Sequence, residues 1–151
     1  MKTILTMLAA AVAAYSHPAA AETDPRAVEE CKVTSATFVQ ISECVPIAHV
    51  AFRTMDAFQA IYPQEAQPLA DRCRELNSDR IVGTEACVRT AIDAAVQLQA
   101  SMPAGSAIED PIFNAVRSDE LRRKLSAEIQ KARSDFPDIR LWGGGSYQPY
   151  R

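Results

Sequence analysis

Four cysteines, Cys31, Cys44, Cys73 and Cys87, constrain the fold of this chain of 151 residues more than any other feature. In small exported domains an even number of cysteines is typical of disulfide bonds, and the first 21 residues, described next, indicate export. Structural zinc sites use close pairs such as Cys-x-x-Cys, whereas no two of these cysteines lie that close together in the sequence. No Cys-x-x-Cys-His segment for attaching haem is present. We therefore expect two disulfide bonds and no metal or other cofactor.

The segment from Met1 to Ala21 has the three parts of a secretory signal peptide. Lys2 supplies a positively charged start, the stretch from Ile4 to Tyr15 is uncharged and largely apolar, and Ala19-Ala20-Ala21 offers a small-residue cleavage site. The uncharged stretch is too short to span a bilayer, which takes about 20 apolar residues. The sequence therefore predicts a signal peptide over residues 1–21 and a periplasmic or secreted product without a membrane span.

The mature chain is expected to be acidic. Removal of residues 1–21 takes away one basic side chain, Lys2, and no acidic one, so the net charge changes from −3 to −4. This balance leaves no overall basic surface for nucleic acid, and it would attract basic partners. The length fits a single domain, which we expect over residues 22–137.

Apolar residues recur at intervals of three and four along the mature chain, and no stretch alternates as a β-strand does. The sequence therefore predicts an all-α bundle of four or five helices. Residues 22–32 contain proline and several acids, which predict an extended lead-in. Thr37 and Gln40 match a capping box, which predicts a short helix to about residue 44. Pro46 predicts the start of a new helix, because proline is favoured in the first turn.

The helix from Pro46 is expected to end before Pro63, because a proline disfavours the helical conformation of the residue that precedes it. The residues on its apolar stripe are Ile47, Val50, Ala51, Met55, Phe58, Ile61 and Tyr62. The residues expected on its solvent-facing side are His49, Arg53, Asp56 and Ala60.

The second half of the chain predicts a helical hairpin followed by one further helix. A short helix, a turn at residues 77–80 and a long helix capped by Thr84 form the hairpin. Residues 103–106 break the long helix, and Ser118 caps a last helix that stops at Pro137. The side chains expected on the solvated back of the long helix, each one turn from the next, are Glu85, Arg89, Asp93 and Gln97.

The spacing of the four cysteines does not determine their pairing, because three pairings are possible. An antiparallel hairpin around residues 77–80 would bring Cys73 opposite Cys87. Cys31 would then pair with Cys44. A nested arrangement, in which Cys31 pairs with Cys87, would instead bind an N-terminal segment to the hairpin. Both arrangements are compatible with the sequence.

The residue pattern predicts no catalytic site. His49 is the single histidine of the mature chain, and its separation from Cys44 does not place the two on one helix face. The paired acids Glu29-Glu30 and Glu109-Asp110 are expected to be solvated. We therefore expect a protein without catalytic residues or enzymatic activity. A small hydrolase that acts on cell-wall or lipid substrates through carboxylates is the alternative.

The cysteine framework carries one family resemblance. A cysteine near the mature N-terminus and a second about a dozen positions later precede the segments Asp71-Arg72-Cys73 and Ala86-Cys87-Val88. Over residues 31–100 this order resembles the LprI-type lysozyme-inhibitor domain, which has Arg-Asp-x-Cys and Cys-Leu in the corresponding places. The family's aromatic positions around the third helix are missing, and no inhibitory residue can be matched. The resemblance implies a helical exported domain that binds and inhibits lysozyme.

The last residues combine glycine with aromatic side chains. Trp142 precedes three consecutive glycines, and Tyr147 and Tyr150 follow them. We expect residues 138–151 to form a flexible tail. In one interpretation its aromatic residues contact a protein or cell-wall glycan partner. In the other, Trp142 packs back onto the bundle. The sequence as a whole predicts an exported, disulfide-stabilised helical protein that binds or inhibits a partner in the cell envelope. A structural subunit of an envelope complex is a further alternative.

Overall fold

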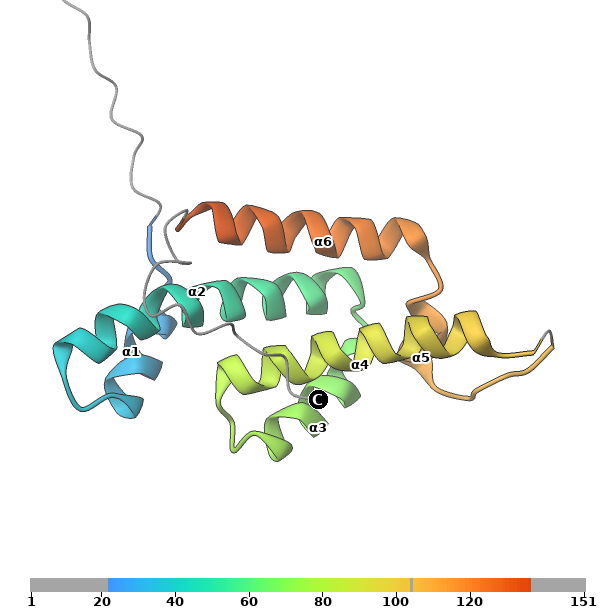
Figure 1. The fold of residues 1–151 in the computed structure, drawn as a ribbon, viewed down its shortest axis with the longest axis horizontal. Helices are drawn as coiled ribbons and strands as arrows, with labels where there is room; N and C mark the ends of the chain where they lie inside the picture. The colour runs from blue at the N-terminus through green and yellow to red at the C-terminus, as the bar shows by residue number, and fades with distance from the viewer. Residues whose placement is uncertain (1–21, 104, 137–151) are drawn as a thin grey trace, which may run out of the picture.

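A long central helix organises the fold, which a computed structural model describes over residues 22–103 and 105–136. These residues form six helices and no strand (Figure 1), which confirms the predicted all-α fold. Helix α2 packs against α1, α3, α4 and α6, and α3 packs against α4. The short helix α5 was not predicted. The helices are α1 (Pro25–Thr34), α2 (Phe38–Ile61), α3 (Ala66–Leu76), α4 (Ile81–Ser101), α5 (Pro111–Ala115) and α6 (Asp119–Ser134).

Helix α1 occupies residues for which the sequence predicted an extended lead-in, so that prediction was wrong. The Asp24 carboxylate accepts a hydrogen bond from the main-chain N–H of Arg26 at 2.9 Å and caps the helix. Pro25 stands in the first turn, where its missing N–H costs no helical hydrogen bond. Ala27 and Cys31, one turn apart, are fully buried in a cluster with residues of α2. The proline and the acid therefore start a helix here.

Helix α2 continues through Pro46, although the sequence predicted that a new helix starts there. Its capping box is confirmed, because the Thr37 hydroxyl accepts from the Gln40 main-chain N–H at 3.3 Å and the Gln40 side chain accepts from the Thr37 N–H at 3.2 Å. A proline inside a helix removes one hydrogen bond and costs about 3 kcal/mol. The disulfide at Cys44 and the buried Ala48 attach both sides of Pro46 to α1, which offsets this cost.

Two disulfide bonds each close a helical hairpin. Cys31–Cys44 joins α1 to α2 with a Cα–Cα distance of 5.8 Å. Cys73–Cys87 joins α3 to α4 at 5.6 Å, across the predicted turn at residues 77–80. The structure thus has the sequential pairing, and the nested arrangement is excluded.

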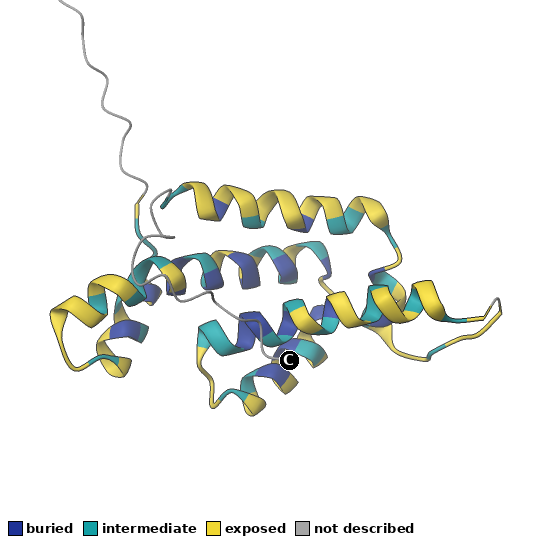
Figure 2. Cartoon of the chain, viewed as in Figure 1, coloured by how far each residue is buried: buried dark blue, intermediate teal, exposed yellow. Residues whose placement is uncertain are grey.

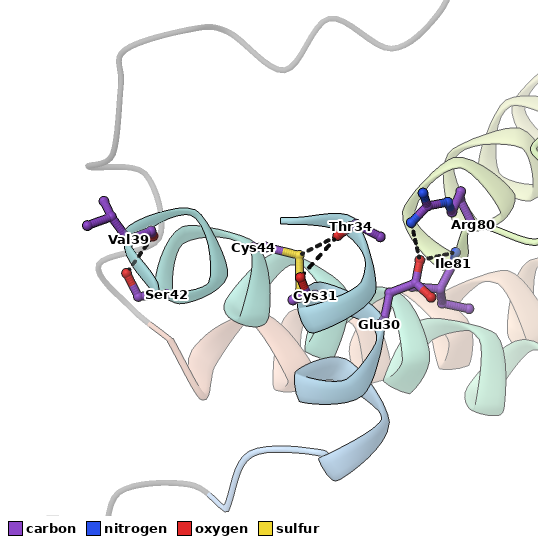
Figure 3. The surroundings of a disulfide bond; sticks show 8 residues. All are labelled: Glu30, Cys31, Thr34, Val39, Ser42, Cys44, Arg80 and Ile81. Carbon is purple, nitrogen blue, oxygen red and sulfur yellow. Dashed lines mark hydrogen bonds and ion pairs between the residues drawn. A yellow bond between two sulfur atoms is a disulfide. The ribbon is translucent and has the colours of Figure 1, made fainter. Parts of the chain in front are cut away.

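Helix α4 begins at Ile81, ahead of the predicted cap at Thr84. The side chain of its N-cap residue, Arg80, makes no capping hydrogen bond. Glu30 of α1 instead accepts a hydrogen bond from the Ile81 main-chain N–H at 3.4 Å (Figure 3). Thr84 and Glu85 therefore lie inside the helix, and both are buried. The prediction of a solvated back for this helix was wrong at Glu85.

The main core lies among α2, α3, α4 and α6, where the facing sides of the helices are buried (Figure 2). Phe58 of α2 and Tyr62, which directly follows that helix, are its largest fully buried side chains, and their ring centroids lie 5.5 Å apart. The Ser118 side chain accepts a hydrogen bond from the Leu121 N–H, which confirms the predicted start of α6. The buried core residues are Met55, Phe58, Tyr62, Ala66, Ala70, Cys73, Val88, Ile92, Val116 and Leu125.

Candidate partner-binding surface

The most exposed large apolar side chains of the described residues lie at the turn between α1 and α2. Val33, near the end of α1, and Phe38, the first residue of α2, are each 82% exposed, and Val39 is 46% exposed. We call residues 33–39 the hairpin tip. Figure 1 shows that it projects from one end of the bundle, and Figure 2 shows both helix ends coloured as exposed there.

Local bonds hold the hairpin tip in one conformation. The Cys31–Cys44 disulfide joins the two helices close behind it (Figure 3). The Ser35 main-chain N–H donates to the Cys31 carbonyl at 3.0 Å and ends α1, and the capping box at Thr37 starts α2 shortly afterwards. A surface that is already ordered loses little conformational entropy when it binds. The tip therefore presents Phe38 at the capped start of a helix that a disulfide joins to its neighbour.

The hairpin tip has the make-up of a small interface. Burying one exposed phenylalanine or valine side chain contributes about 1.5–3 kcal/mol, so these residues gain most from a partner that covers them. Lys32 and Glu29 form an exposed ion pair at 2.7 Å beside them, and Ser42 and Glu43 are exposed on α2. Exposed apolar residues with charged residues beside them are common at protein-binding surfaces.

The sequence pattern contains little indication of the hairpin tip. Phe38 appeared there only as a residue within the capping box, and Val33 followed the segment predicted to be extended. Both flank a short turn and lie outside the periodic apolar stripe. An apolar residue directly before and another directly after a predicted turn would have been the signal for Val33 and Phe38.

The predicted site residues lie in separate places. Cys31 and Cys73, each in its own hairpin, are buried. The predicted contact residues Trp142, Tyr147 and Tyr150 lie outside the described residues, as do the predicted signal peptide and the remainder of the tail.

His49 is buried, although the sequence placed it on the solvent-facing side of its helix. Its Nδ1 accepts a hydrogen bond from the Asp24 main-chain N–H at 3.0 Å, and its Nε2 lies 3.1 Å from Oδ2 of Asp135. The Phe136 ring meets the imidazole edge-on, with centroids 5.0 Å apart. The end of α6 therefore covers this part of α2. Both ring nitrogens have protein partners, which favours a structural role over a role as general base.

The paired acids of the sequence make separate structural contacts. Glu29 pairs with Lys32 on its own helix, and Glu30 bonds to the start of α4. The Asp110 carboxylate accepts a hydrogen bond from the Phe113 N–H at 2.8 Å and caps α5. Glu109 is exposed. These contacts serve helix ends and surface ion pairs.

Glu85 is a buried carboxyl inside α4. Burial raises the pKa of Glu85, and the nearby guanidinium of Arg89 opposes that rise. Arg89 lies one turn along the same helix, with its Nε 2.5 Å from the carboxylate. Glycoside hydrolysis uses two carboxyl groups that face each other. The Glu85 carboxyl is instead paired with a cation of its own helix.

Within residues 22–103 and 105–136, no three His, Cys, Asp or Glu side chains lie close enough together to hold a metal ion. None of the helices in this part of the chain is both long and apolar enough to cross a membrane. Comparison with known proteins finds no matching family model, curated protein or solved structure.

Proposed function

We propose that this chain is an exported helical protein that binds a protein of the cell envelope through the hairpin tip. The observation that carries the proposal is the exposure of Val33 and Phe38, 82% each, on a hairpin that a disulfide closes. Exposed apolar clusters on a rigid support mark protein-binding surfaces, and aromatic residues are frequent anchors in them. The leader-like residues 1–21 and the two disulfides support export to an oxidising compartment.

Lysozyme is the partner we propose to test first. The cysteine framework resembles that of LprI-type inhibitors, and a mature chain of net charge −4 would attract basic proteins, as many lysozymes are. A projecting apolar tip fits a concave surface, and enzyme active sites are concave. A tip seated in such a cleft would exclude the substrate. Inhibition therefore requires no catalytic group on this chain.

The experiment is a titration of lysozyme activity with the mature protein, residues 22–151. We expect inhibition at micromolar concentration, and a loss of at least tenfold in potency for Phe38→Ser, because loss of an anchoring aromatic costs about 1.4 kcal/mol or more. Leu98→Ser is the matched control, because Leu98 is a 44% exposed apolar residue near the end of α4, and that end lies opposite the hairpin tip in the bundle (Figure 1). It should inhibit as the wild type does.

Two outcomes would contradict the proposal in different ways. If the protein neither inhibits lysozyme nor retains any protein from an envelope extract at micromolar concentration, the binding function is wrong. If Phe38→Ser and Leu98→Ser bind lysozyme equally well, the protein binds through a surface other than the hairpin tip. Circular dichroism of both variants should show unchanged helix content, because both side chains are exposed.

A further inference from the structure

We infer that His49 is a proton-controlled latch, which holds residues 22–24 against α2 when its imidazole is neutral and releases them when it is protonated. The side chain of His49 is 3% exposed and lies in the middle of α2. It contacts Asp24, which precedes α1, and Asp135, which follows α6. One imidazole therefore connects both ends of the described chain to the central helix.

The geometry selects one form of the imidazole. Nδ1 receives the main-chain N–H of Asp24 at 3.0 Å, so this nitrogen must carry a free lone pair. The hydrogen of the neutral ring is then on Nε2, from which it donates to Oδ2 of Asp135 at 3.1 Å. No other protonation state satisfies both contacts, since the doubly protonated ring has no acceptor.

Protonation affects the two contacts in opposite ways. A hydrogen added to Nδ1 would point at the Asp24 N–H, and two donors cannot share a hydrogen bond. The Nε2–H contact to Asp135 would survive and become an ion pair, which is stronger than a neutral hydrogen bond. The proton thus breaks the contact of the Asp24 main chain with α2 and keeps the end of α6 attached. Histidine is the side chain that ordinarily changes charge between pH 5 and 8.

The surrounding charges determine which carboxylate stabilises the imidazolium. Asp24 already accepts hydrogen bonds from the Arg26 side chain, so its carboxylate is engaged. Asp135 is the carboxylate at hydrogen-bond distance from the ring. The charged residues that line the space beside His49, from α1, α2, α6 and the residues that flank α1 and α6, are Glu22, Asp24, Arg26, Arg53, Lys131 and Asp135.

The release would stay local. Beyond its first turn, α1 is held by the Cys31–Cys44 disulfide and by the contact of Glu30 with α4. The hairpin tip therefore keeps its conformation. The first turn of α1 also stays in place, because Arg26 pairs with Asp24 at 2.6 Å and with Asp56 of α2 at 2.5 Å. The release is thus confined to the Asp24 main-chain N–H and the residues before it. The inference is independent of the proposed binding function, because it concerns the opposite end of α1.

The test is nuclear magnetic resonance of the ¹⁵N-labelled mature protein, residues 22–151, between pH 7.5 and pH 5.0. We expect the His49 ring to carry its hydrogen on Nε2 at pH 7.5 and to become doubly protonated on acidification. The protection of the Asp24 amide against hydrogen exchange, corrected for the intrinsic rate, should fall at least tenfold. The pH midpoint of this loss should equal the midpoint at which His49 becomes protonated. The Ser35 amide, which bonds to the Cys31 carbonyl, is the internal control and should keep its protection.

Two variants complete the test. His49→Asn retains an acceptor near the position of Nδ1 and cannot be protonated, so Asp24 protection should be equal at both pH values. Asp135→Asn retains an oxygen that can accept from Nε2–H, so the Asp24 amide should stay protected at pH 7.5. A hydrogen on Nδ1 at pH 7.5, unchanged Asp24 protection while His49 becomes charged, or a loss that persists in His49→Asn would overturn the inference. If His49→Asn does not fold, the midpoints measured in the wild type decide.

Discussion

The Glu30 carboxylate of α1 accepts a hydrogen bond from the main-chain N–H of Ile81, the first residue of α4, at 3.4 Å (Figure 3). The Arg80 guanidinium lies 3.9 Å from the same carboxylate oxygen. Ile81 also packs against the buried cluster around Cys31. A single carboxylate thus caps a helix that is distant in the sequence and connects the two disulfide-closed hairpins. The negative charge is well placed there, because the start of a helix carries a partial positive charge.

Replacing Glu30 should weaken the connection between the hairpins. Glu30→Ala should lower the free energy of unfolding by about 1 kcal/mol, as expected for loss of a helix cap, and Glu30→Gln should lower it less because the amide oxygen can still accept. Urea denaturation measures both values. Glu29→Ala is the matched control, since Glu29 pairs only with Lys32 on the surface. Equal stability of Glu30→Ala and Glu29→Ala would show that Glu30 is not a cap.

The two disulfides should contribute similarly to stability, because they close loops of similar length, with sequence separations of 13 and 14. Removing either one should cost about 3 kcal/mol. Thermal unfolding of the two double alanine variants, at Cys31 with Cys44 and at Cys73 with Cys87, measures the loss. Only the first variant should also lose binding at the hairpin tip. A melting temperature that strong reductant leaves unchanged would mean that the bonds do not stabilise the fold.

The buried carboxyl of Glu85 should make stability depend on pH. Burial raises the pKa of Glu85 above its usual value of 4.5. A raised pKa in the folded state means that the stabilisation is fully present below the unfolded pKa and is lost as pH rises through the folded pKa. From pH 4 to pH 7 the wild type should therefore lose stability relative to Glu85→Gln. Urea denaturation at four pH values across this range tests the sign, and a relative gain of the wild type would contradict it.

Deletion of residues 140–151 separates the two roles predicted for the tail. If Trp142 packs onto the bundle, the shortened protein should melt several degrees lower and bind its partner as before. If Trp142, Tyr147 and Tyr150 contact the partner, the melting temperature should stay and the affinity should fall. Thermal unfolding and the lysozyme titration, carried out on the same two proteins, distinguish these outcomes.

The sequence predicted a structural feature correctly where that feature depends on contacts within one helical turn. The capping box of Thr37 and Gln40 and the cap at Ser118 depend on contacts within a single turn, and both were predicted. The symmetric placement of Cys73 and Cys87 about a turn indicated the closure of α3 and α4 as one of two arrangements left open, and the structure has that one. The class of the fold followed from the helical spacing of the apolar residues.

Distant contacts explain what the sequence did not predict. The start of α4 depends on Glu30, and the burial of His49 depends on the end of α6, far away in the chain. The continuity of α2 through Pro46 depends on packing against α1 and on the disulfide at Cys44. The exposure of Phe38 reflects the absence of a covering element among the described residues, and a periodic pattern within one helix contains no such information.

Site-specific photo-crosslinking in the native envelope tests most directly whether the hairpin tip is the binding surface. A photoreactive phenylalanine analogue replaces Phe38 in one variant and the exposed control residue Leu98, near the end of α4, in another. We predict that irradiation joins the Phe38 variant to one defined protein, and that an excess of wild-type chain competes that product away. The Leu98 variant should give no such product. The same product from both positions, or a competable product from Leu98 alone, would contradict the proposed binding surface.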